Sequence, residues 1–293
     1  MNTLLIAGFG DIAQRALPLL AARFHVTALV RPERVREIPT RPGLVIEPGD
    51  LDDPASLQRF AGRASHILHC APPAGIGTTD PRTANLAAML AACALPQRLV
   101  YISTSGVYGD CAGAWVDETR AVNPATDRAR RRANAEAQIV AFQHAHAVRC
   151  VILRAPGIYA ADRLPLERLR KGTPVLRPED DVYTNHIHAD DLAAIAVAAL
   201  TRPDAQGIYN ACDDTQLSMG DWFDLLADRA GLPRPPRIAR AQAASRIPAA
   251  LLSFMSESRR LSNRRMREEL GVQLRYPTVF DGLPAAIDAT GPA

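Results

Sequence analysis

The first part of the chain alternates short apolar runs with longer segments in which apolar positions recur at helical spacing. The apolar runs predict buried strands, at residues 3–7, 26–30, 44–46, 66–70, 99–102 and 150–153. The segments between them predict helices, at residues 13–23, 83–93 and 133–146, with another helix that begins at Asp53 and Pro54. Strands that alternate with helices in this way form a parallel sheet covered on both faces.

The alternation breaks after Arg154. Residues 189–200 predict one more helix and residues 207–211 one more strand, whereas the chain from Asp221 onward consists of helical pieces separated by prolines. We therefore expect an α/β protein with a mainly parallel sheet of about seven strands. Its domains are expected to be a nucleotide-binding domain and a smaller substrate lobe, from residues 1–155 with 186–211 and from residues 156–185 with 212–293, respectively.

Composition narrows the class of protein. The chain has 293 residues, of which 47% are hydrophobic and 22% charged, as in ordinary folded proteins. No apolar run approaches the roughly 20 residues of a membrane span, and Gly8 and Gly10 interrupt the first run, unlike a signal peptide. The cysteines form no C-x-x-C pair, so we expect no metal site and a cytoplasmic protein. A net charge of +3 gives no reason to expect nucleic acid.

A glycine-rich turn follows the first predicted strand. Gly8-x-Gly10-x-x-Ala13 has the spacing of a dinucleotide-binding turn, in which the first glycine permits a tight turn and the second lets a pyrophosphate approach the backbone. The small Ala13 lets helix and strand pack closely. The turn predicts a Rossmann-type, doubly wound sheet with a nucleotide at Gly8, Gly10, Asp11 and Ile12; the alternative is a relic that binds nothing.

The end of the second strand indicates which nucleotide is bound. An NAD site usually carries a carboxylate there for the ribose 2′-hydroxyl, but this chain has Arg31, with Arg34 one turn further. Arginine pairs with a 2′-phosphate, so the sequence favours NADP(H) over NAD(H). The alternative is that Arg31 only ends the strand in solvent.

Later strand ends supply further cofactor candidates. Asp50 and Leu51 follow the third strand and are expected near the adenine, although Asp50 is equally well explained as a loop cap. The fourth strand ends in Ala71-Pro72-Pro73, a stiff wall expected beneath the nicotinamide ribose.

These features, together with motifs further along, resemble the extended short-chain dehydrogenase/reductase family, also called the NAD-dependent epimerase/dehydratase family. The motifs are Tyr101-Ile-Ser103-Thr104-Ser105-Gly-Val107-Tyr108-Gly109, Leu153-Arg154-x-x-x-Ile158-Tyr159, Asn185-His186-Ile187-His188-Ala-Asp190-Asp191-Leu192 and Ile208-Tyr209-Asn210. The resemblance implies that Thr104 bonds the substrate oxygen, unless its hydroxyl only bonds its own backbone. It also implies cofactor contacts from Ser103 and Pro156.

The resemblance breaks at the family's Tyr-x-x-x-Lys pair, whose tyrosine carries the proton. Arg128 and Arg132 stand at those two places, and Lys171, the one lysine, lies far beyond. Arginine does not deprotonate in proteins, so Arg128 is no general acid, but Arg132 could take over the lysine's grip on the ribose. The alternative is that both arginines point into solvent. Other candidates for the proton carrier are Tyr108, Tyr159, Tyr183 and His186, and Tyr108 is usually a packing residue in relatives.

Arginines also crowd the C-terminal part. A few of them could receive a phosphate or carboxylate of a substrate, while most are expected on a solvated face, at positions 234, 237, 240, 246, 259, 260, 264, 265 and 267. The sequence thus favours an NADP(H)-dependent oxidoreductase or isomerase for a small polar substrate, with an anionic substrate as one option. The alternative is an inactive sensor of NADP(H). The sequence leaves the oligomeric state open, with a homodimer as one option.

Overall fold

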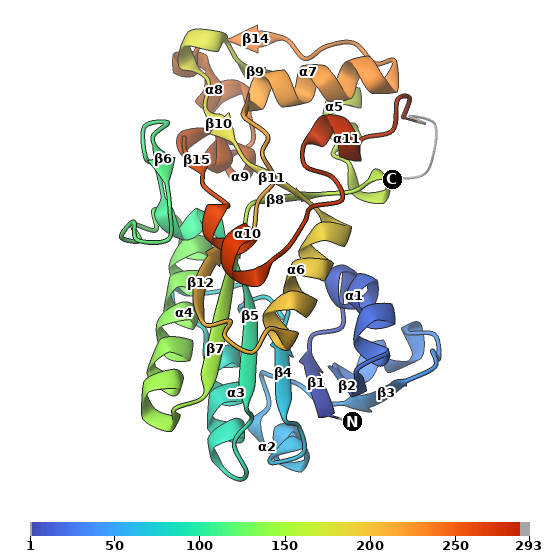
Figure 1. Ribbon diagram of the computed structural model, residues 1–293. Coiled ribbons are helices and arrows are strands. Elements are labelled where there is room, and N and C mark those ends of the chain that lie inside the picture. The colour runs from blue at the N-terminus through green and yellow to red at the C-terminus, as the bar shows by residue number, and fades with distance from the viewer. Residues whose placement is uncertain (1, 288–293) are drawn as a thin grey trace.

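The computed structural model describes residues 2–287 (Figure 1). Its centre is a seven-stranded sheet in which every neighbouring pair is parallel, with the order β12-β7-β5-β4-β1-β2-β3. The strands are β1 (Asn2–Ala7), β2 (Phe24–Val30), β3 (Leu44–Pro48), β4 (His66–His69), β5 (Arg98–Thr104), β7 (Arg149–Ala155) and β12 (Gly207–Asn210). The expected doubly wound parallel sheet is confirmed.

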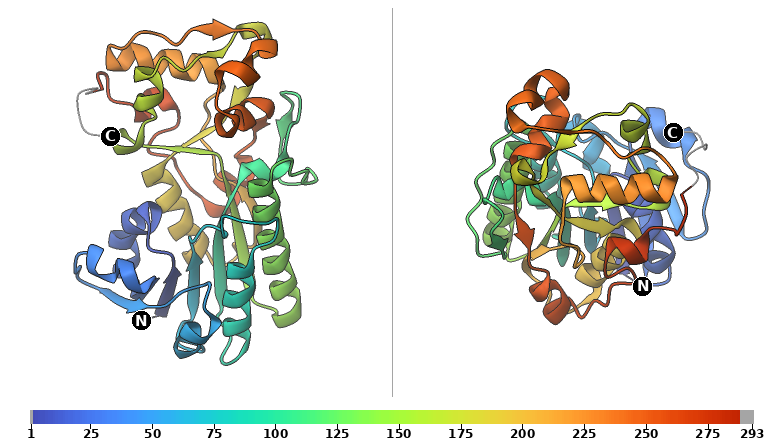
Figure 2. Two further views of the ribbon diagram at one scale, coloured as in Figure 1. Left: turned by 180° about the vertical axis from the view of Figure 1, so that it is seen from behind. Right: turned by 90° about the horizontal axis from the view of Figure 1, so that it is seen from above.

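Helices cover both faces of this sheet. One face carries α1 (Asp11–Ala21) and α6 (Ala189–Thr201), and the other carries α2 (Pro54–Leu57), α3 (Pro81–Ala91) and α4 (Asp127–His146) (Figures 1 and 2). Alternate residues of β1 enter the two cores: Leu4 and Ile6 pack under α1 and α6, whereas Leu5 and Ala7 pack under α3 and α4. This two-sided burial explains why the strands are continuous apolar runs in the sequence.

The C-terminal lobe lies beyond the carboxyl ends of the sheet strands and has its own core around Trp222, Phe223 and Met255 (Figures 1 and 2). Its helices are α5 (Leu166–Arg170), α7 (Met219–Ala230), α8 (Arg240–Arg246), α9 (Ala249–Leu252) and α11 (Val279–Gly282), while α10 (Arg264–Leu270) packs near β12.

Four short strand pairs lie within the lobe or between the lobe and the sheet domain. They are β8 (Gly157–Tyr159) with β11 (His186–His188), β9 (Val175–Leu176) with β14 (Arg237–Ile238), β10 (Tyr183–Thr184) with β13 (Leu217–Ser218), and β6 (Trp115–Val116) with β15 (Arg260–Leu261). Residues 186–188 thus pair with β8 and not with the central sheet.

Short 3₁₀ helices complete the described chain: η1 (Pro32–Glu37), η2 (Gln58–Phe60), η3 (Ser105–Tyr108), η4 (Ala161–Arg163), η5 (Pro178–Asp180) and η6 (Ser253–Ser256). Within residues 2–287 no helix combines the length and the apolar character needed to cross a membrane.

Candidate functional site

Three cavities follow one another along the carboxyl edge of the central sheet. We call them the glycine-turn cavity (about 260 Å³, around Gly8, Gly10 and Arg31), the central cavity (about 350 Å³, around Pro73, Thr104 and Arg132) and the lobe cavity (about 340 Å³, around Tyr183, Phe254 and Arg259). Pro72 lines both of the first two cavities. Thr104, Arg128, Pro156 and Ile158 line both of the last two. The three cavities therefore adjoin one another in a row, and the last two lie between the sheet domain and the lobe.

The glycine turn has two glycines with different physical roles. Gly8 has φ +91°, and a Cβ on it would lie 2.7 Å from the backbone nitrogen of Ala71. Gly10, in contrast, has no heavy atom within 4 Å of an added Cβ, and it caps the N-terminus of α1 without any side-chain hydrogen bond. An open backbone at the start of a long helix presents N–H groups and the positive end of the helix dipole. This cradle fits a pyrophosphate.

Asp11 and Ile12 were also predicted at the glycine turn, but their side chains do not line the glycine-turn cavity. Ile12 is buried in the core beneath α1. The carboxylate of Asp11 accepts hydrogen bonds from Arg15 at 2.7 Å and from Arg163 at 2.5 Å. Any contact of Asp11 or Ile12 with a phosphate would therefore come from the backbone.

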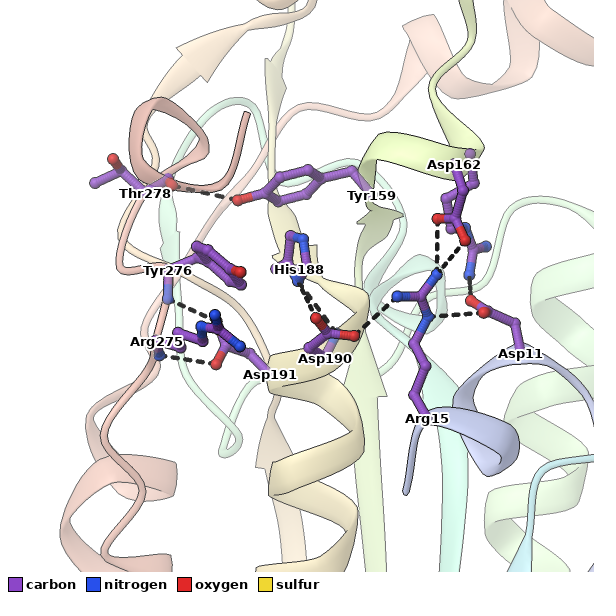
Figure 3. A network of polar contacts seen from close by, with 11 residues as sticks. Asp11, Arg15, Tyr159, Asp162, His188, Asp190, Asp191, Arg275, Tyr276 and Thr278 are labelled. Atoms are coloured by element: carbon purple, nitrogen blue, oxygen red, sulfur yellow. Dashed lines mark hydrogen bonds and ion pairs between the residues drawn. The ribbon is translucent and has the colours of Figure 1, made fainter. Parts of the chain in front are cut away.

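Arg15 gathers three carboxylates from three parts of the chain (Figure 3). It donates to Asp11 at 2.7 Å, to Asp190 at 2.8 Å and to Asp162 at 2.7 Å. Although partial burial opposes it, these hydrogen bonds raise the pKa of Arg15 above its usual value. The contacts tie α1, which carries the glycine turn, to α6 and to η4 of the lobe.

Arg31 and Arg34, which the sequence analysis proposed for a 2′-phosphate, both line the glycine-turn cavity. Each has one acidic neighbour on the surface: Arg31 lies 3.2 Å from Glu33, and Arg34 lies 3.0 Å from Glu37. Such exposed pairs contribute little stability, so both guanidiniums are available to a ligand phosphate.

Asp50 and Leu51 also line this cavity, and the carboxylate of Asp50 accepts a hydrogen bond from the backbone of Asp52 at 2.9 Å. Asp50 therefore does both things that the sequence analysis considered: it caps its own loop and it lines the cavity. Arg82 is a lining residue that the sequence analysis missed. It pairs with Asp52 at 2.6 Å and donates to the Pro72 carbonyl at 3.1 Å. The helix start at Asp80 and Pro81, which places Arg82 in the first turn of α3, was the sequence feature from which this position could have been predicted.

Ala71 and Pro72 line the glycine-turn cavity, and Pro72, Pro73 and Pro156 line the central one. Thr104, at the end of β5, lines the central and lobe cavities. Its hydroxyl accepts from the Gly106 N–H at 3.2 Å, as the backbone alternative expected. Because a hydroxyl that accepts one hydrogen bond keeps its own proton to donate, Thr104 can still bond a substrate oxygen.

Ser103 also lines the central cavity, but its hydroxyl donates to Glu136 at 2.5 Å. Glu136 in turn accepts from Arg154 at 2.7 Å, and all three side chains are buried. Glu136 and Arg154 form a buried ion pair, and removing one partner of such a pair typically costs about 3–5 kcal/mol of folding stability. Ser103 is therefore held by the core, and its hydroxyl is already committed.

The arginines at the positions of the missing Tyr-x-x-x-Lys pair lie in the site. Arg132 lines the central cavity and donates to the Tyr101 hydroxyl at 2.9 Å and to the Ile102 carbonyl at 2.8 Å. Arg128 lines the central and lobe cavities, and its guanidinium lies 4.2 Å from the ring centre of Phe254. The run is therefore not a uniformly solvated face, although Arg130 does form a surface pair with Asp127.

Tyr108 requires a correction, because the structure gives it no access to a substrate. Its side chain is 1% exposed, lines none of the three cavities and donates to Asn210 at 2.8 Å. Desolvation also raises its pKa, although the neighbouring Arg154 opposes the shift. Tyr108 is therefore a packing residue in this structure and not a candidate proton carrier.

Two other proton-carrier candidates are buried in the lobe junction. The Tyr159 hydroxyl donates to the Thr278 carbonyl at 3.2 Å (Figure 3). His186 is 3% exposed and lies 4.4 Å from the ring of Trp222, and its burial lowers the pKa to about 3. Of the four candidates only Tyr183 lines the lobe cavity.

The C-terminal arginines lie at or near the surface. Four of them are exposed (Arg234, Arg240, Arg246 and Arg264), and the others are partly buried. Most of these side chains also form bonds within the protein. They bond carboxylates or backbone carbonyls, as in the pairs Arg234–Asp228, Arg237–Asp224, Arg240–Met255, Arg260–Gly113, Arg265–Glu269 and Arg267–Asp214. Within this group Arg259 lines the lobe cavity, where it pairs with Glu257 at 2.9 Å. Arg163 from η4 joins it there and was missed by the sequence analysis.

A protein-family model and solved structures match this chain. The family model described as NAD-dependent epimerase/dehydratase matches residues 10–212. A conserved protein of unknown function from Silicibacter pomeroyi is 31% identical and has a TM-score of 0.76, with 96% of each chain covered. No curated protein matches the chain.

Two solved enzymes share the fold at lower identity. The UDP-glucuronic acid 4-epimerase from Bacillus cereus in complex with NAD is 16% identical with a TM-score of 0.76, covering 98% of this chain and 97% of that one. The UDP-glucose 4-epimerase from Thermotoga maritima with UDP-glucose is 15% identical with a TM-score of 0.78, covering 97% of each.

Proposed function

The chain belongs to the NAD-dependent epimerase/dehydratase family, and on this basis we propose that it is an NADP(H)-dependent oxidoreductase or isomerase acting on a small polar, anionic substrate. The observation that carries the proposal is the row of three adjoining cavities, in which neighbours share lining residues. A dinucleotide laid along the sheet edge from Gly10 toward Thr104 would bring its reactive end to the residues that the central and lobe cavities share.

The residues present fit a nicotinamide dinucleotide. The open backbone at Gly10 would receive the pyrophosphate, Asp50 and Leu51 would flank the adenine, and Pro73 and Arg132 would flank the nicotinamide ribose. When bound, this cofactor supplies reversible hydride exchange with a substrate carbon.

The preference for NADP(H) is supported by the two arginines in the glycine-turn cavity. Arg31 and Arg34 take the place where an NAD site carries a carboxylate, and their guanidiniums suit a 2′-phosphate. The anionic character of the substrate is supported by the lobe cavity. Its charged lining residues are Arg128, Arg163, Arg259 and Glu257, an excess of positive charge. The substrate lobe, residues 156–185 and 212–293 in this proposal, supplies the last three of them.

A sensor without catalysis is the competing function, and one feature favours it. Arginines stand in place of the family's Tyr-x-x-x-Lys pair, so the usual proton carrier is missing. Thr104 and Tyr183 nevertheless give the lobe cavity hydroxyl groups for substrate chemistry, which favours the enzyme.

Two measurements test the proposal in sequence. Titrating NADPH and NADH by nicotinamide fluorescence should show tighter binding of NADPH. A panel of carbonyl and alcohol substrates, followed at the NADPH absorbance, should then show turnover with anionic members. Equal affinity for the two cofactors would refute the NADP(H) preference. Tight NADPH binding without turnover of any substrate in the panel would favour the sensor over the enzyme.

A further inference from the structure

Arg128 differs from the other arginines of the site because its charge has no ionic partner. Among residues 2–287 no hydrogen bond or ion pair joins its guanidinium, which belongs to an exposed side chain and lies 4.2 Å from the centre of the Phe254 ring. The other two arginines of the lobe cavity are engaged, since Arg163 bonds Asp11 and Arg259 bonds Glu257. Arg128 therefore keeps all of its N–H donors for a ligand.

The surroundings of Arg128 favour an anion. Desolvation lowers its pKa, and the nearby guanidiniums of Arg132, Arg259 and Arg131 lower it further, against the opposing charge of Glu257. Like charges held close together repel, so a bound carboxylate or phosphate relieves the repulsion. The ring of Phe254 beneath the guanidinium supports its plane, which suits a planar, two-pronged contact.

The position of Arg128 indicates where the anion would lie on the substrate. Arg128 and Thr104 line the same two cavities, at the place where these cavities join. If Thr104 bonds the reacting oxygen, an anion held by Arg128 belongs to a neighbouring carbon. A carboxylate bonded directly to the reacting carbon meets this requirement, whereas a phosphate ester stands at least one atom further away.

We propose that Arg128 is a substrate-binding residue that receives the carboxylate of a 2-oxo or 2-hydroxy acid. This inference rests on the proposed function and names its substrate class. It also gives a physical reason for arginine where relatives have tyrosine, because a guanidinium cannot exchange a proton but binds a carboxylate through two parallel hydrogen bonds.

The test uses oxamate, a stable analogue of a 2-oxo acid, titrated by calorimetry into the full chain saturated with NADPH. Oxamate should bind, and Arg128→Gln should weaken it by about 10-fold or more, the usual loss for a charged hydrogen bond. Arg128→Lys should restore only part of the affinity, because lysine lacks the fork. Arg130→Gln is the matched control, since Arg130 lies on the same helix in a surface pair with Asp127.

Each result bears on a different claim. Retained NADPH affinity in Arg128→Gln shows that the variant is folded and that the loss concerns the substrate alone. Equal oxamate affinity in Arg128→Gln and the original chain would overturn the inference, as would inorganic phosphate binding in place of oxamate. Absence of oxamate binding with normal NADPH binding would overturn the carboxylate class and leave the cofactor proposal standing. Absence of NADPH binding would overturn both.

Discussion

Arg15 and Asp190, separated by 175 positions in the sequence, are joined by a hydrogen bond of 2.8 Å. The same guanidinium also holds Asp11 and Asp162, so it bridges the three carboxylates that Figure 3 draws around it, while Arg163 also pairs with Asp11. Its side chain is 20% exposed, which leaves these contacts partly shielded from water. The first helix after the glycine turn is in this way fixed to α6 and to the lobe.

We expect Arg15→Gln to lower the free energy of unfolding by about 1–3 kcal/mol, because Asp162 and Asp190 lose their arginine partner and Asp11 keeps only Arg163. Urea unfolding measures this loss. Arg130→Gln, which removes one exposed pair with Asp127, should cost less than about 0.5 kcal/mol. Equal losses in the two variants would show that the network around Arg15 is no stronger than a surface pair.

The two glycines of the turn should respond differently to alanine. Gly8→Ala should destabilise the fold by about 2 kcal/mol or more, because φ +91° is unfavourable for alanine and its Cβ would strike Ala71. Gly10→Ala should change stability by less than about 1 kcal/mol and weaken NADPH by about 10-fold or more, because its Cβ points into open space at the helix start. Thermal unfolding and NADPH titration separate the two effects. Normal NADPH affinity in Gly10→Ala would place the pyrophosphate elsewhere.

Arg31→Asp should reverse the preference between the two cofactors. The new carboxylate repels a 2′-phosphate and can accept from a ribose hydroxyl, so NADPH should lose about 10- to 100-fold in affinity while NADH gains. Arg36→Asp is the matched control, since it makes the same charge change on η1 without lining the cavity. A similar shift in both variants would mean that only the general charge of this loop matters.

Arg132→Ala should weaken NADPH binding by about 1–3 kcal/mol if its guanidinium holds the nicotinamide ribose. The substitution also removes the hydrogen bond to Tyr101, which has to be distinguished from a cofactor contact. Tyr101→Phe removes that hydrogen bond and leaves the guanidinium in place, so it should bind NADPH nearly normally. An unchanged dissociation constant for Arg132→Ala would exclude Arg132 from the cofactor site.

His186 should make stability depend on pH in acid. Burial lowers its pKa from 6.5 to about 3, so the folded chain keeps the imidazole neutral while the unfolded chain protonates it. The stability associated with His186 is therefore complete above pH 6.5 and decreases as the pH falls toward 3. Relative to His186→Phe, the original chain should lose about 2 kcal/mol between pH 7.5 and 5.0. Parallel stability curves in urea would show that the imidazole is accessible to protons in the folded chain.

The sequence by itself determined the central sheet and the glycine turn, because both are encoded locally. Strands buried on both faces are apolar runs, and the conformational demand at Gly8 is met by one residue type whatever the rest of the chain does. The apolar pattern alone placed helix ends less well: it begins at residue 133, whereas α4 begins at Asp127, because most side chains of the arginine-rich first turns lie at cavities or in solvent.

Only the tertiary structure decided the roles of individual side chains in the site. Tyr108 follows Thr104 by four positions, yet one is buried against Asn210 while the other lines two cavities. Arg163 lines the lobe cavity, and its guanidinium is held by a hydrogen bond to Asp11, 152 positions away in the sequence. Packing between segments far apart in the chain sets which way each side chain points, and no local pattern records it. For the same reason the sequence identified Arg128 as a replacement for tyrosine, but only the assembled cavities show it as a guanidinium without an ionic partner among the described residues.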